Sequence, residues 1–241
     1  VYTPPFKDEQ GQIIEGSIAE FKRIEIGGVQ QAILIRGKSV DNPVILFLHA
    51  GPGMSETGLM RNFHAELEEH FTMVYLDQRG GAKSYSPFIS ADTMTTKQLL
   101  TDIHEVTLFV KDYLNKDKII LVGHSFGAGF GTLAAHTYPE DYLLYVGLGQ
   151  PVAPVECDRR SYPYVLELSE NENNTQAVKE LAEIENFWLS RDMKTYFTGM
   201  SVLKKWVGYY GGQIYGETSP TPFILKNMMS DEFTIFDWLP Y

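Results

Sequence analysis

Apolar and polar positions divide the chain into a strand-rich first part and a helical second part. Residues 21–26 alternate apolar and polar side chains, as a half-buried strand does, and a second stretch over residues 29–35 follows Gly27 and Gly28. Two strands joined at a glycine pair predict a tight β-hairpin. Four short, continuous apolar runs are typical of strands buried on both faces: residues 44–48, 73–76, 119–122 and 143–146.

Helical periodicity lies between these runs. Residues 95–113 carry an apolar stripe at i, i+3, i+4 and i+7, and Thr95 and Gln98 are spaced as a capping box. A further helix is expected over residues 125–136, before Pro139. Strands that alternate with helices predict βαβ units, and so an α/β fold with a mostly parallel sheet and helices on both faces.

The strand pattern ends near residue 150. Residues 161–170, 175–187 and 193–205 then read as helices separated by polar or glycine-rich breaks. We therefore predict three parts: an N-terminal lead-in over 1–20, an α/β core over 21–150, and a helical cap over 151–241.

The candidate nucleophile is Ser125. It is the centre of Gly123-His124-Ser125-Phe126-Gly127, which fits G-x-S-x-G between a buried strand and a helix. In that context the motif predicts a nucleophile elbow, a strained strand-to-helix turn that exposes the serine hydroxyl at a helix N-terminus. Glycines stand two residues to either side because a side chain there would collide with the neighbouring strand and helix.

A second motif, His49-Ala50-Gly51-Pro52-Gly53, directly follows the strand predicted over 44–48. A backbone N–H beyond that strand can point at the same carbonyl oxygen as the N–H of Phe126. We therefore predict an oxyanion hole built from the N–H groups of Gly51 and Phe126. His49 is expected to tie down the loop rather than to act as a base.

With these motifs the chain resembles proline-iminopeptidase-like α/β-hydrolases. His49 to Gly53 is similar to their H-G-G-P-G loop and Asp77-Gln78-Arg79-Gly80 to their D-Q-R-G turn, and with the serine motif the three cover roughly residues 20–150 in the family's order. The resemblance implies a serine peptidase that releases N-terminal residues, often proline, from short peptides. Ala50, Ala82 and Phe126 depart from the family's pattern and bear on the proline preference.

The sequence offers no base for the serine. In this fold the order is Ser, then Asp or Glu, then His, and the only histidine after Ser125 is His136, roughly 16 Å further along the same helix. We read His64, His70 and His104 as structural or solvated, and His124 as pointing away from the site. The catalytic Asp and His are therefore expected on two further strands beyond the cap, and the chain is expected to be cut short before them and inactive alone. A natural pseudo-hydrolase, or a protein completed by a second chain, is the alternative.

The composition of the chain limits which classes of binding partner we expect. The net charge of −11 argues against nucleic acid and anionic membranes. One cysteine, Cys157, excludes an intramolecular disulfide, and neither a metal-ligand spacing nor a cofactor motif is present. We expect no cofactor and no metal, a small peptide, amide or ester as substrate, and self-association through an exposed sheet edge. The compartment stays open between cytoplasmic and anchored to a bacterial membrane by an upstream segment, which is implied by the resemblance.

The leading hypothesis is a serine hydrolase that forms an acyl-enzyme on Ser125. Acidic residues of the predicted cap could bind a substrate's N-terminal ammonium, for instance Glu167, Glu170 and Glu217. A carboxylesterase or lipase, and a non-catalytic binding protein on a hydrolase fold, remain the alternatives.

Overall fold

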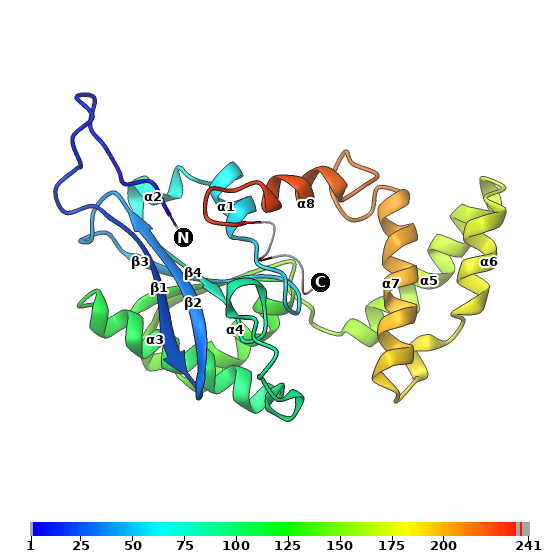
Figure 1. Cartoon of the computed structure of the whole chain (residues 1–241). Helices are drawn as coiled ribbons and strands as arrows, with labels where there is room; N and C mark the ends of the chain where they lie inside the picture. The colour runs from blue at the N-terminus through cyan, green and yellow to red at the C-terminus, as the bar shows by residue number, and fades with distance from the viewer. Residues whose placement is uncertain (1, 235–236, 238–241) are drawn as a thin grey trace. The chain divides into compact units, whose positions relative to one another are not determined.

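The structure, a computed structural model, describes residues 2–234 and 237. Contacts divide the chain into two compact units (Figure 1). The first unit contains the described residues up to Pro151 and those from Leu225 onward, and the second is Val152–Ile224.

The first unit is built on one sheet of six strands in the order β1-β2-β4-β3-β5-β6. The β1–β2 and β2–β4 pairs are antiparallel, and β3 pairs in parallel with both β4 and β5, as β5 does with β6. The predicted hairpin and the mostly parallel sheet are thereby confirmed. The strands are β1 (Ile18–Ile26), β2 (Val29–Gly37), β3 (Val44–Leu48), β4 (Thr72–Asp77), β5 (Ile119–His124) and β6 (Tyr142–Leu148).

Helices cover both faces of this sheet, as predicted. On one face, Ile33 and Ile35 of β2 share a buried core with α3 (Thr96–Tyr113) and α4 (Phe126–Thr137). On the other, Leu34 packs in a core with residues of α1 (Thr57–Phe63) and α2 (Leu67–His70). This alternation along β2 follows from the two-residue side-chain period of a strand. Short 3-10 helices occur at Ala82–Ser84, Ala91–Thr93, Pro139–Asp141 and Phe187–Leu189.

The strand predicted over 143–146 forms within β6, but the expectation that it is buried on both faces is wrong. Leu143 and Leu144 are 65% and 55% exposed, and Leu148 is 45% exposed. The cause is position, because β6 lies at the edge of the sheet with β5 as its neighbour. An apolar run indicates a strand, whereas its burial depends on what packs beside it.

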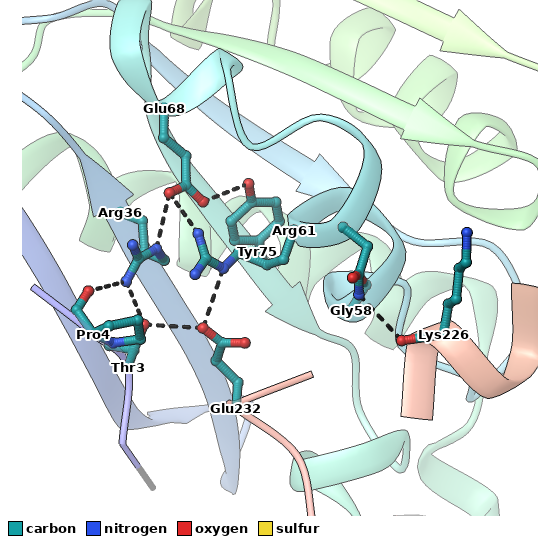
Figure 2. A network of polar contacts seen from close by, with 10 residues as sticks. Thr3, Pro4, Arg36, Gly58, Arg61, Glu68, Tyr75, Lys226 and Glu232 are labelled. Carbon is teal, nitrogen blue, oxygen red and sulfur yellow. Dashed lines mark hydrogen bonds and ion pairs between the residues drawn. The ribbon is translucent and has the colours of Figure 1, made fainter. Parts of the chain in front are cut away.

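A network of buried charges joins distant parts of the first unit (Figure 2). Glu68 of α2 accepts hydrogen bonds from Arg36 of β2 at 2.9 Å and from Arg61 of α1 at 2.7 Å. Arg61 also donates to Glu232 at 3.1 Å, and Glu232 accepts from the Thr3 hydroxyl at 3.0 Å. Two guanidinium groups and two carboxylates balance one another in charge, which is what burial of ions requires.

The second unit is helical, with α5 (Pro154–Asn171), α6 (Thr175–Glu183) and α7 (Met193–Tyr209). Each corresponds to a predicted helix, although α5 begins earlier and α6 ends earlier than expected. Asn186, in the left-handed conformation, follows the end of α6. The buried core of this unit is Tyr162, Val165, Ala177, Leu181, Phe187, Leu203 and Trp206. Among the described residues no helix is both long and apolar enough to cross a membrane.

A further helix, α8 (Thr221–Met228), was not predicted. The predicted cap range of 151–241 also needs correction at its end, because the described residues from Leu225 onward contact the first unit. Asn227 is buried there: its side-chain carbonyl accepts the Leu59 N–H at 3.0 Å, and its amide donates to the Ser55 carbonyl. Whether Val152–Ile224 acts as a cap stays a prediction.

Candidate active site

Ser125 occupies a sharp turn between β5 and α4. Its backbone has φ 50° and ψ −114°, a conformation that a residue with a Cβ adopts only under strain. Its N–H donates to the carbonyl of Leu148, at the end of β6, at 2.8 Å. The serine is thus held at the carboxyl ends of two parallel strands, where ligands of α/β proteins bind.

Two glycines of the serine motif are required by close backbone packing. A Cβ on Gly127 would lie 2.2 Å from the carbonyl oxygen of Leu48 and 2.6 Å from that of His49. A Cβ on Gly123 would lie 2.5 Å from the carbonyl oxygen of Gly127. The start of α4 therefore rests against the backbone at the end of β3, where the second predicted motif begins.

The N-terminus of α4 presents amide groups beside Ser125. The N–H groups of Ala128 and Gly129 donate to the Ser125 carbonyl at 3.0 and 3.2 Å. Phe126 and Gly127 come earlier in the helix, where an N–H has no intrahelical acceptor. Such amides, at the positive end of the helix dipole, favour a negative charge.

The loop after β3 is held by three side chains. The carbonyl of His49 accepts from the Gln78 amide at 3.0 Å, and the N–H of Ala50 donates to Glu56 at 2.8 Å. The carbonyl of Ala50 pairs with Nδ1 of His49, whose Nε2 accepts the backbone N–H of Gln78 at 3.1 Å. Nδ1 is therefore the protonated nitrogen of this ring.

Two successive peptide units, His49–Ala50 and Ala50–Gly51, contain four polar groups, and within the described part of the chain one of them makes no hydrogen bond. In the unit between His49 and Ala50 both the carbonyl and the N–H are bound, and in the next unit the carbonyl is bound. The fourth group is the N–H of Gly51. Because the carbonyl and N–H of a trans peptide point in opposite directions, binding of the Ala50 carbonyl also fixes where the Gly51 N–H points. Gly51 has φ 146°, which favours glycine.

Glu56 is a site residue that the sequence analysis missed. It directly precedes α1, yet its side chain forms no cap hydrogen bond to that helix. Instead it binds the N–H of Ala50 and lies 2.8 and 2.9 Å from Nδ1 of His124, the neighbour of Ser125. The hydrogen bond to Glu56 raises the pKa of His124. No local sequence pattern could predict this contact, because His124 lies 68 residues further along the chain.

The turn after β4 anchors this arrangement to the rest of the first unit. Arg79 donates to both carboxylate oxygens of Asp102 in α3, at 2.6 and 2.9 Å, and to the carbonyl of Gly27 at 2.8 Å. Both side chains are buried. Asp77, the first residue of this turn, is buried as well, and burial raises its pKa. The D-Q-R-G turn thus connects the hairpin and α3 to the loop that Gln78 holds.

Five of the six histidines take the roles that the sequence predicted for them. His49 is buried and ties down its loop, His104 pairs with Asp141 at 3.1 Å, and His64, His70 and His136 are exposed. Within the described part of the chain, no histidine forms a hydrogen bond with the Ser125 hydroxyl, and no group of three or more His, Cys, Asp or Glu side chains could hold a metal ion.

A family model described as the alpha/beta hydrolase fold matches residues 43–227. The chain belongs to the α/β-hydrolase fold family. The matched part includes the loop after β3, the D-Q-R-G turn and the serine elbow, which are the three features that positioned the site above.

Relatives of this α/β-hydrolase carry aminopeptidase names. A probable aminopeptidase, YbaC, of Bacillus subtilis is 37% identical over 155 residues, which are 64% of this chain and 49% of the relative. A proline iminopeptidase of Neisseria gonorrhoeae is 29% identical over 117 residues, 48% of this chain and 36% of the relative. These names confirm the resemblance stated from the motifs. The matched residues span about half or less of these relatives.

A solved structure supports the fold. A proline iminopeptidase-related protein from Thermus thermophilus aligns with a TM-score of 0.53 over 87% of this chain and 72% of its own. Its sequence identity of 22% shows the shared fold alone.

Proposed function

We propose that this α/β-hydrolase is a serine hydrolase in which Ser125 attacks a carbonyl carbon and forms an acyl-enzyme. The single observation that carries the proposal is the conformation of Ser125, strained at the junction of β5 and α4. A fold tolerates such strain where the surroundings enforce it, and such positions cluster at active sites.

The N–H groups of Gly51 and Phe126 would hold the oxyanion of the tetrahedral intermediate. Among the described residues, the N–H of Gly51 is the group of the His49–Ala50 and Ala50–Gly51 peptide units that makes no hydrogen bond, and Phe126 lies at the first position of α4. Because Gly127 packs against the backbone of His49, the two candidate donors belong to neighbouring segments. Preorganised donors of this kind contribute about 10²–10³ each to the rate.

We propose that the substrate is a short peptide. Its N-terminal residue would be released, as by an aminopeptidase of the proline-iminopeptidase type. The support is the names of the relatives together with the three motifs. The proposal needs no cofactor and no metal.

A serine hydroxyl also needs a base. Each buried or half-buried histidine of the first unit is bound to another group: His49 to Ala50 and Gln78, His104 to Asp141, and His124 to Glu56. We therefore propose that residues 1–241 by themselves retain only the residual catalysis that remains when a triad member is missing, about 10³–10⁴ over water.

Two measurements test the proposal. The full-length protein should react with a fluorophosphonate probe and lose that reaction in Ser125→Ala, and it should cleave aminoacyl-arylamides faster than acyl esters. Exclusive ester turnover would replace the peptidase with a carboxylesterase, and absence of labelling would replace the enzyme with a binding protein. Rapid turnover by residues 1–241 alone, lost in Ser125→Ala, would contradict the proposed dependence on a further base.

A further inference from the structure

We propose that Glu56 is a positioning residue that locks the oxyanion loop to the nucleophile turn through His124. The proposal rests on the proposed function, because it assigns a role to Glu56 in presenting the Gly51 N–H beside Ser125.

The first argument is where the Glu56 side chain makes its contacts. Glu56 directly precedes α1, and its side chain makes no hydrogen bond to that helix. It turns toward Ala50 and His124 instead, and its side chain is only 12% exposed there. Desolvation of a carboxylate is costly unless it is hydrogen-bonded, so these two contacts account for its burial.

The second argument is that Glu56 bridges two segments that both enter the site. One carboxylate oxygen, Oε2, accepts the Ala50 N–H at 2.8 Å and lies 2.9 Å from Nδ1 of His124, while Oε1 lies 2.8 Å from the same nitrogen. Ala50 precedes the candidate donor Gly51, and His124 precedes Ser125. A shift of either segment would break a charge-assisted hydrogen bond, which is among the stronger polar contacts in proteins.

The third argument concerns α1 itself. Glu56 is fixed at the start of α1, and that helix is held in turn by Asn227, which contacts Ser55 and Leu59. The residues on either side of Glu56 are therefore anchored to Asn227, which belongs to the first unit. The carboxylate is presented from a fixed backbone rather than from a loose loop.

Glu56→Ala and Glu56→Gln in the full-length protein test the proposal, with Glu66→Ala, an exposed residue just before α2, as the matched control. Hydrogen exchange of the segment containing Ala50 is followed by mass spectrometry, and fluorophosphonate labelling of Ser125 is timed in parallel. We expect Glu56→Ala to speed exchange of this segment at least tenfold and to slow labelling about tenfold. Glu56→Gln keeps an acceptor for the Ala50 N–H and should restore labelling to within about threefold of the wild type. The control should change neither.

The two readouts separate failure of this proposal from failure of the proposed function. Unchanged exchange in Glu56→Ala overturns the positioning role whether or not the serine reacts. Faster exchange with no labelling of the wild type supports the lock and overturns the serine hydrolase. Equal labelling loss in Glu56→Ala and Glu56→Gln would also count against positioning through the Ala50 N–H.

Discussion

Gln78 and His49 exchange two hydrogen bonds that join the turn after β4 to the loop after β3. The Gln78 amide donates to the His49 carbonyl at 3.0 Å, and its backbone N–H donates to Nε2 of the imidazole at 3.1 Å. Both residues are buried. The D-Q-R-G turn therefore contacts the site directly, through Gln78.

Removal of the Gln78 side chain should loosen this loop. Gln78→Ala leaves the buried His49 carbonyl without a donor, which should lower the free energy of unfolding by about 1–3 kcal/mol. Fluorophosphonate labelling of Ser125 should slow about tenfold, because the Gly51 N–H is less well placed. Urea unfolding and labelling kinetics measure the two effects. Gln10→Ala, at an exposed residue, should alter neither, and an unchanged labelling rate in Gln78→Ala would show that the loop needs no clamp.

Two glycines of α4 should respond oppositely to alanine. A Cβ on Gly127 would lie 2.2 Å from the Leu48 carbonyl oxygen, so Gly127→Ala should cost about 1–3 kcal/mol of stability. On Gly129 the nearest atom would be the side chain of Pro151 at 3.7 Å, an ordinary contact, and Gly129→Ala should gain up to about 1 kcal/mol from helix propensity. Thermal or urea unfolding of the pair checks this, and equal destabilisation would refute the packing argument.

The backbone strain at Ser125 should lower the free energy of unfolding by a measurable amount. Ser125→Ala keeps a Cβ and therefore the unfavourable φ of 50°, whereas Ser125→Gly removes it. The glycine variant should exceed the alanine variant by about 1 kcal/mol in the free energy of unfolding. If alanine proved the more stable of the two, the turn would not be storing strain.

The Glu56–His124 pair should make stability depend on pH. The folded pKa of His124 is raised above its ordinary value of 6.5 by the hydrogen bond to Glu56, so the pair stabilises the fold fully below pH 6.5. That contribution is lost as the pH rises through the folded pKa. The difference in unfolding free energy between the wild type and His124→Asn should therefore shrink with rising pH, as urea titrations between about pH 5.5 and 9 would reveal. A difference that is constant across this range would contradict the pairing.

The exposed leucines of β6 should promote association. Edge strands present unpaired backbone groups, and Leu143, Leu144 and Leu148 add apolar surface. We expect residues 1–241 to self-associate in sedimentation velocity experiments and Leu144→Lys to shift them toward the monomer. Leu108→Lys serves as control, since Leu108 is also 45% exposed but belongs to α3 rather than to β6. A monomer at all concentrations would exclude this surface as a contact.

Local patterns were sufficient for the elements of the sheet and for the elbow. The alternation in β1, the apolar runs of β3 to β6 and the glycines around Ser125 each reflect a constraint within a few residues. The N-cap of α3 also formed as its sequence predicted, with Thr95 accepting the Gln98 N–H at 3.1 Å.

Contacts between segments that are distant in the sequence could not be predicted from local patterns. The Gln98 side chain does not reach back to Thr95, because it donates to Asp102 in the cluster around Arg79. The sequence analysis did not single out Glu56, and it expected the partner of Glu56, His124, to point away from the site. α8 was not predicted, and its buried Asn227 is explained by the backbone groups of Ser55 and Leu59 that it satisfies.

The network around Glu68 bears on how this unit is made. Arg61 and Glu232 are 171 residues apart in the chain, yet they form one ion pair. At roughly 5–20 residues per second, a ribosome would take on the order of ten to thirty seconds to deliver the second partner after the first. During that interval the chain contains Glu68, 7 residues from Arg61, but not yet Glu232. The buried network is therefore completed only after Glu232 has been synthesised, and a product that ends before this residue would lack its carboxylate permanently.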